Sequence, residues 1–222
     1  MGLVAILVVV AGFGGSYWGM AAGTGSLAPI VRVHGVVFAL WLVVYLVQTR
    51  LIAGRQVRWH RRLGYASIAL AAAMVILGYS TAIAGARRGF DLNFTGDPLG
   101  YMVFPLGSIV AFAALVAAGL VYRRRAEVHK RLMLLATVGP LMNAPLAHLF
   151  AHTAALRGKV PLFLAAMVVL LAASAVHDRV TRGRIHPVSL WVASALFAWG
   201  NLQAVVIGPS AAWHRFAAWL IG

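Results

Sequence analysis

The sequence contains no cysteine, and only 4 of its 222 residues are acidic. The absence of cysteine excludes disulfide bridges, thiolate metal sites and a cysteine nucleophile. Charged residues make up 10% of the chain, against about 25% in an ordinary soluble domain. With 62% apolar residues and a mean hydropathy of +0.89, the composition excludes a soluble globular domain and a disordered chain. It predicts an all-α bundle of transmembrane helices.

Several sequence motifs of enzymes and transporters are also missing. The chain has no phosphate-binding loop, dinucleotide-binding fingerprint or nucleophile elbow, so nothing indicates ATP- or NAD-dependent chemistry. None of the acidic residues lies deep in an apolar run; they are Asp91, Asp97, Glu127 and Asp178. Ion-coupled transporters usually carry a carboxylate inside the membrane, so this distribution counts against that class.

Apolar runs long enough to cross a bilayer recur along the whole chain. A helix is expected for each, because it satisfies its own backbone hydrogen bonds in lipid and the runs do not alternate like barrel strands. We predict one membrane domain over residues 1–222 with seven spans: 2–22, 30–51, 64–85, 100–122, 131–152, 161–178 and 187–207. The first run has no basic leader and no clean cleavage site, so we expect it to be retained. The tail, residues 211–222, predicts an interfacial segment.

The basic residues predict how the helices are oriented. The net charge of +15 comes from 19 Lys and Arg residues. In a soluble domain this charge would indicate nucleic acid, but here most of the basic residues fall in alternate short loops. Such loops are typical of the cytoplasmic side of a membrane, so we predict an amino terminus inside and a carboxyl terminus outside. The same loops are expected to contact anionic lipid headgroups.

The 8 histidines form two layers near the ends of the predicted spans. The inner layer is His60, His129, His177 and His186, and the outer layer is His34, His148, His152 and His214. An interfacial role is one interpretation, because the polar tips of His, Arg and Trp reach the headgroups. The other interpretation is ligation, because imidazoles on facing helices hold haem iron in bundles.

The ligation hypothesis predicts b-type haem near each face of the membrane and therefore electron transfer. The predicted inner ligands are His60 and His129 with His177 or His186, and the predicted outer ligands are His34 with His148 or His152. Arg62 and Arg131 are expected to pair with haem propionates, since arginine binds carboxylates well.

The second predicted span carries a polar and aromatic stripe. His34, Trp41 and Gln48 follow one another at intervals of seven residues, so they share one helix face, with Tyr45 close to it. Such a stripe should face the bundle interior. It is a candidate pocket for a quinol substrate, with Gln48 and Tyr45 as contacts. Inter-helix hydrogen bonding with aromatic packing is the alternative.

The fifth predicted span is the most irregular. Pro140 and Pro145 each remove a backbone hydrogen bond and should kink the helix. Asn143 should be buried against a partner, and it is a further candidate for the substrate pocket. His148 and His152 are four residues apart and so share a face, which is a suitable spacing for a metal ion. A kinked packing helix with interfacial histidines is the alternative.

The motifs His60–Gly64 (HRRLG) and His129–Met133 (HKRLM), with Gly183–Val188 before the last span, are similar to a group of bacterial multi-pass membrane proteins of unknown function. The resemblance implies a protein of the bacterial inner membrane and supplies no activity. That group commonly carries an arginine near the end of the fifth span, where this chain has Asn143 and His148. The layered histidines more loosely resemble cytochrome b561-type bundles.

The sequence therefore leaves three functions open. The leading hypothesis is electron transfer through b-type haem. The second is a non-enzymatic accessory or assembly subunit of a larger membrane complex, favoured by the scarcity of carboxylates and catalytic motifs. The third is a metal transporter built around His148, His152 and His34. No catalytic residue follows from the sequence, and it does not decide whether the protein is an enzyme.

Overall fold

The computed structural model describes residues 2–21, 28–91 and 96–222, and residues 16–21 by their backbone alone. This part of the chain is all-α, as the composition predicts. The elements in order are α1 (Gly2–Ala21), α2 (Pro29–Ala53), α3 (Val57–Arg87), α4 (Pro98–Tyr101), α5 (Val103–Val121), α6 (Ala126–Val138), α7 (Pro140–His152), α8 (Val160–Arg182), α9 (Pro187–Leu202), the π-helical turn η1 (Gln203–Ile207) and α10 (Ala211–Ile221).

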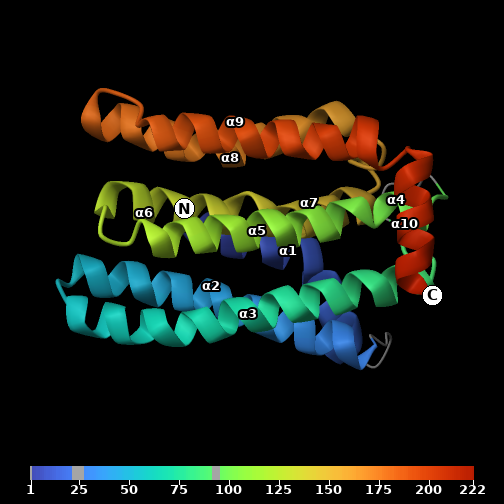
Figure 1. Ribbon diagram of the computed structural model, residues 1–222, viewed down its shortest axis with the longest axis horizontal. Helices are drawn as coiled ribbons and strands as arrows, with labels where there is room; N and C mark the ends of the chain where they lie inside the picture. Colours follow the sequence, from blue (N-terminus) through green and yellow to red (C-terminus); the bar gives the residue numbers. More distant parts are fainter. Residues whose placement is uncertain (1, 22–27, 92–95) are drawn as a thin grey trace.

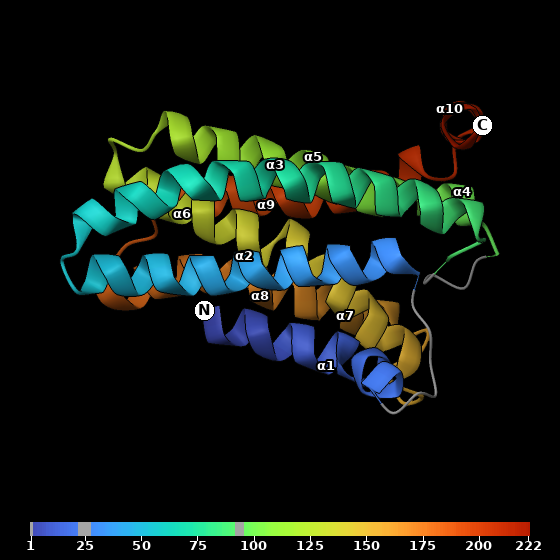
Figure 2. The ribbon, with the colours of Figure 1, turned by 90° about the horizontal axis from the view of Figure 1, so that it is seen from below.

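Six helical segments in the described part are long and apolar enough to cross a membrane. They are Pro29–Ala53, Val57–Arg87, Pro98–Val121, Ala126–His152, Val160–Arg182 and Pro187–Ile207. These segments fit a multi-pass membrane protein. They correspond to six of the seven predicted spans. The first predicted span corresponds to α1, whose described side chains form an apolar segment over Gly2–Gly15. Figure 2 shows α1 beginning part-way along the bundle.

The spans form a bundle of antiparallel hairpins (Figure 1). In this view α2 and α3 form one layer, α5 with α6 and α7 the next, and α8 with α9 the third. The core lies where the first two layers meet, because Trp41, Met74, Phe112 and Leu135 are each almost completely buried there. The polar and aromatic stripe on α2 therefore faces other helices, as the spacing predicts.

Helix α1 packs along α7, and a glycine makes the close approach feasible. A Cβ atom on Gly12 would overlap the carbonyl oxygen of Pro145. Ala5 is completely buried in the same helix, so small side chains allow the two backbones to approach. The carbonyl oxygen of Gly12 also lies 2.7 Å from Nδ1 of His148, which ties α1 to the end of α7.

The fifth predicted span is broken, as its prolines suggest. It begins at Ala126, five residues before its predicted start, and divides at Gly139 into α6 and α7. Pro140 has no N–H to continue the hydrogen bonds of α6, and Gly139 adopts φ −86° and ψ −90°. Pro145 lies inside α7 without ending it. The earlier start places His129 and Arg131 within the first two turns of α6.

The carboxyl-terminal helix α10 crosses the end of the bundle at a steep angle to the spans (Figure 1). Nε1 of Trp213 donates to the carbonyl oxygen of Leu99 at 2.8 Å, and Nε of Arg87 donates to that of Ile221 at 2.8 Å. His214 Nε2 lies 2.8 Å from a carboxylate oxygen of Asp97. The predicted interfacial tail is thus a helix fixed across one end of the molecule.

Candidate functional site

Two histidines from different helices face one another at the end of the bundle where α2 turns into α3. His60 lies in the first turn of α3 and His129 in the first turn of α6. Their ring centres are 6.3 Å apart and the ring planes are inclined by 80°. Histidine nitrogens lie about 2.0–2.1 Å from a bound metal, so two imidazoles on opposite sides of one ion have ring centres roughly 6 Å apart. The observed separation fits this arrangement.

The ring nitrogens of the pair differ in their hydrogen-bond partners. Nδ1 of His129 lies 2.8 Å from the carbonyl oxygen of Gly119, so it can donate there and leave Nε2 as an acceptor. Metal-binding histidines usually have their second nitrogen held in this way. Nδ1 of His60 is buried and has no hydrogen-bond partner among the described residues.

Gly119 on α5 determines the position of the His129 ring. A Cβ atom at this position would lie 2.8 Å from Sδ of Met133 and 3.8 Å from Nδ1 of His129. A larger side chain would therefore require Met133 to move. The glycine lets its own carbonyl group reach the imidazole, which restrains the ring of His129.

The outer histidines are not arranged as an opposed pair. The rings of His148 and His152 lie side by side on α7, with centres 4.1 Å apart, so they cannot bind opposite faces of one haem. His34 stacks on Phe38 at 4.0 Å, and no contact found in the described part joins it to either of them. Nor do the described residues include a group of three or more histidines and carboxylates able to hold a metal ion. The prediction of an outer haem therefore has no geometric support here.

Arg131 and His186 belong to a different cluster, an ion network between α6, α8 and α9. Arg131 and Asp178 are each only 2% exposed, and Nε of Arg131 donates to Asp178 at 2.9 Å. The other terminal nitrogens of Arg131 bond to Asp178 and, at 2.7 Å, to Glu127. With its guanidinium enclosed by two carboxylates, Arg131 is not available to a haem propionate.

Two serines and a histidine complete this network. Oγ of Ser189 donates to Asp178 at 2.6 Å and lies 2.9 Å from Oγ of Ser174. The backbone N–H of His186 donates to Asp178 at 3.3 Å, and its Nδ1 accepts from the N–H of Val188 at 3.2 Å. His186 thus caps α9, and its described contacts do not include His60 or His129. Sequence reasoning missed the network, although the scarcity of acidic residues was a signal that Asp178 has a specific partner.

Arg62 faces away from the His60 pair. Its guanidinium lies 5.1 Å from the ring centre of Trp59, and both line a groove of about 440 Å³ between α2 and α3. Residues two apart on a helix point to opposite sides, which separates Arg62 from His60. Arg62 is exposed on the outer surface of the bundle.

The stripe on α2 contains both satisfied and unsatisfied polar groups. Nε1 of Trp41 donates to Oγ1 of Thr137 at 3.1 Å, and the Trp41 ring packs edge-on against Phe112 at 5.0 Å. In contrast, Oε1 of Gln48 and Nδ1 of His34 are buried without a partner among the described residues. Of the other candidates, Tyr45 and Asn143 are half-buried on α2 and α7. Of the two residues with an unpaired buried atom, Gln48 lies nearer to the end of α2 that is close to His60, and His34 lies near the opposite end.

The fold and the apolar helices define the class of this chain, a multi-pass helical membrane protein. The chain matches no protein-family model, no curated protein and no solved structure. Any more specific function therefore depends on the geometry described above.

Proposed function

We propose that this protein is a membrane electron carrier that binds b-type haem between His60 and His129. The two neighbouring imidazoles, with ring centres 6.3 Å apart and on separate helices, are the observation on which the proposal depends. Haem would supply one-electron chemistry at this site. We place the protein in the bacterial inner membrane with the α2–α3, α5–α6 and α8–α9 turns on the cytoplasmic side, because arginine is concentrated there.

The protein residues would hold and tune such a group in distinct ways. Gly119 accepts a hydrogen bond from Nδ1 of His129, which holds the ring and leaves Nε2 as the nitrogen available to iron. The buried nitrogen of His60 gains a partner on binding, which removes the cost of an unsatisfied polar atom. Gln48 has an unpaired buried oxygen, which makes it our candidate for hydrogen bonding to a quinol hydroxyl, with Tyr45 one turn away.

An absorption spectrum of the detergent-purified protein, before and after dithionite reduction, tests the proposal. We expect a sharp reduced band at about 560 nm, typical of bis-imidazole haem. His60→Ala and His129→Ala should abolish it. His177→Ala is the matched control, because His177 is an exposed histidine near the same end of the bundle.

A band that survives in the double variant of His60 and His129 would place the haem elsewhere. A featureless spectrum from folded protein supplied with haem would reject electron transfer. Purification within a larger complex would then favour the accessory-subunit hypothesis.

A second candidate is transition-metal binding by His148 and His152, as in a metal carrier. Their side-by-side rings and the bond from His148 to Gly12 favour a single ion held on one face of α7. Elemental analysis of protein purified without chelators should then find stoichiometric metal, and His152→Ala should remove it. Protein free of metal would eliminate this candidate.

A further inference from the structure

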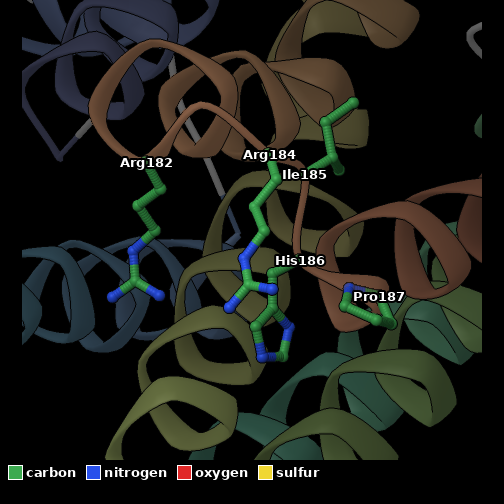
Figure 3. A pocket seen from close by; sticks show the side chains of 5 residues that line it. All are labelled: Arg182, Arg184, Ile185, His186 and Pro187. Carbon is green, nitrogen blue, oxygen red and sulfur yellow. The ribbon is translucent and has the colours of Figure 1, made fainter.

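A basic pocket opens at the turn between α8 and α9. Its volume is about 350 Å³, and it is lined by Arg182, Arg184, Ile185, His186 and Pro187. Figure 3 shows the side chains of Arg182, Arg184 and His186 extending to the same side of the turn, toward α6, while Ile185 points away. Three nitrogen-rich groups therefore share one opening.

The carboxylates near this pocket neutralise only part of its positive charge. Asp178 is enclosed by Arg131 and Ser189 and is only 2% exposed. Glu127 pairs at once with Lys130, Arg131 and Arg182. The other two acidic residues of the sequence, Asp91 and Asp97, belong to the opposite end of the bundle. The pocket thus keeps an excess of positive charge.

The three nitrogen-containing side chains of the pocket, Arg182, Arg184 and His186, differ in how they can bind an anion. The ion pair with Glu127 fixes the guanidinium of Arg182 at the rim. Arg184 makes no hydrogen bond or ion pair with the described residues, so its donors are free. Nδ1 of His186 accepts from Val188, which leaves Nε2 to carry the proton and donate. Partial burial, together with the charge of Arg131, lowers the pKa of His186, so this donor stays neutral near pH 7.

We propose that this pocket binds a phosphate group through Arg182, Arg184 and His186. Arginine matches the paired oxygens of phosphate, and the amino-terminal end of α9 adds a favourable helix dipole. The turn connects the ends of two candidate membrane spans, Val160–Arg182 and Pro187–Ile207, so it is expected to lie at the depth of the phospholipid headgroups. An anionic phospholipid and free inorganic phosphate present the same chemistry to the pocket, and the experiment separates them.

The test uses full-length protein, stripped of lipid in a neutral detergent and titrated while ligand binding is followed by native mass spectrometry. The probes are short-chain phosphatidylglycerol, phosphatidylcholine of equal chain length, and sodium phosphate. Arg184→Gln is the main variant, because Arg184 makes no described contact that folding would need. Arg124→Gln removes the same charge from the exposed α5–α6 turn at the same end of the bundle and is the matched control.

We expect phosphatidylglycerol to bind more tightly than phosphatidylcholine. Arg184→Gln should weaken the binding of phosphatidylglycerol about fivefold. Arg124→Gln should change it by less than about twofold, because only diffuse charge is lost. Phosphate binding that is equally sensitive to Arg184→Gln would identify the free anion as the ligand, whereas lipid binding alone would identify the headgroup. Equal effects of the two variants, or no binding of either anion, would overturn the proposal.

Discussion

At the scale of single residues, the buried ion pair of Arg131 and Asp178 is the feature whose disruption should destabilise the protein most. Both side chains are 2% exposed and lie in separate helices. Removing one member of such a pair leaves a buried charge with reduced compensation, which typically costs about 3–5 kcal/mol. Ser189 donates to Asp178 and is itself hydrogen-bonded to Ser174, but neither serine carries a charge, so they cannot replace the compensation that Arg131 and Asp178 give each other.

We therefore expect Asp178→Asn to lower the free energy of unfolding by about 3 kcal/mol, measured by chemical or thermal denaturation in detergent. Glu127→Gln removes the same charge from the same arginine, but Glu127 is 45% exposed, so it should cost less than about 1 kcal/mol. A double change of Arg131→Met with Asp178→Leu should recover much of the loss. Equal costs for the two single variants would show that burial does not control the strength of this network.

A second residue pair makes the docking of α10 depend on pH. His214 donates from Nδ1 to the carbonyl oxygen of Ser210 at 2.9 Å and from Nε2 to Asp97 at 2.8 Å. These bonds raise the pKa of His214 above its ordinary value. Partial burial opposes ionisation of Asp97, but hydrogen bonds from Gly100 and His214 hold the pKa of this carboxyl below its ordinary value.

The stabilisation of the docked α10 by protonated His214 is complete below the ordinary pKa of histidine and is lost as pH rises through the raised pKa. That by ionised Asp97 is complete above its ordinary pKa and is lost as pH falls through the lowered value. We expect the protection factors of Ala211–Ile221, which correct hydrogen exchange for its intrinsic pH dependence, to be largest between the two ordinary pKa values and to fall severalfold at most toward pH 9, since the pair is partly exposed. His214→Gln should remove this fall in protection. An unchanged exchange profile in this variant would contradict the assignment.

At the scale of helices, the packing of α1 depends on one glycine. A side chain at Gly12 would collide with the backbone of α7, whereas one at Gly15 would meet nothing within 4 Å. We expect Gly12→Val to destabilise the protein by about 1–3 kcal/mol through overpacking and to loosen α1. Gly15→Val changes the same residue type in the same helix and is the control. Thermal unfolding with limited proteolysis of α1 would show the difference, and equal behaviour would disprove it.

The sequence predicted most of these helices but not their partners. Length and hydropathy located the spans, and Pro140 marked the break between α6 and α7. The spacing on α2 correctly predicted that Trp41 faces the interior. Hydropathy could not show that Arg131 would meet Asp178, which is 47 residues away, because a span's rotation depends on side-chain packing. For the same reason the sequence suggested Arg131 and Arg62 as partners of one cofactor, although Arg131 is buried in an ion network and Arg62 is exposed.

At the scale of the whole molecule, the absence of cysteine makes the orientation directly testable. The turns α2–α3, α5–α6 and α8–α9 lie at one end of the bundle (Figure 1). We expect Arg124→Cys to react with a membrane-impermeant maleimide only after bacterial cells are permeabilised. Ala155→Cys, in the α7–α8 turn at the other end, should react in intact cells. The reverse pattern would invert the orientation.

Helix α10 gives the bundle a fixed relation to the plane of the membrane. It crosses the ends of the spans, and Trp219 is 74% exposed along its length. Aromatic residues of this kind settle at the boundary between hydrocarbon and headgroups. Many bundles adapt to a thicker or thinner bilayer by changing their tilt. Here a change of tilt would drive one end of α10 into hydrocarbon and the other into water. The bundle should therefore stand at a constant inclination, and hydrophobic mismatch should be absorbed by the lipid.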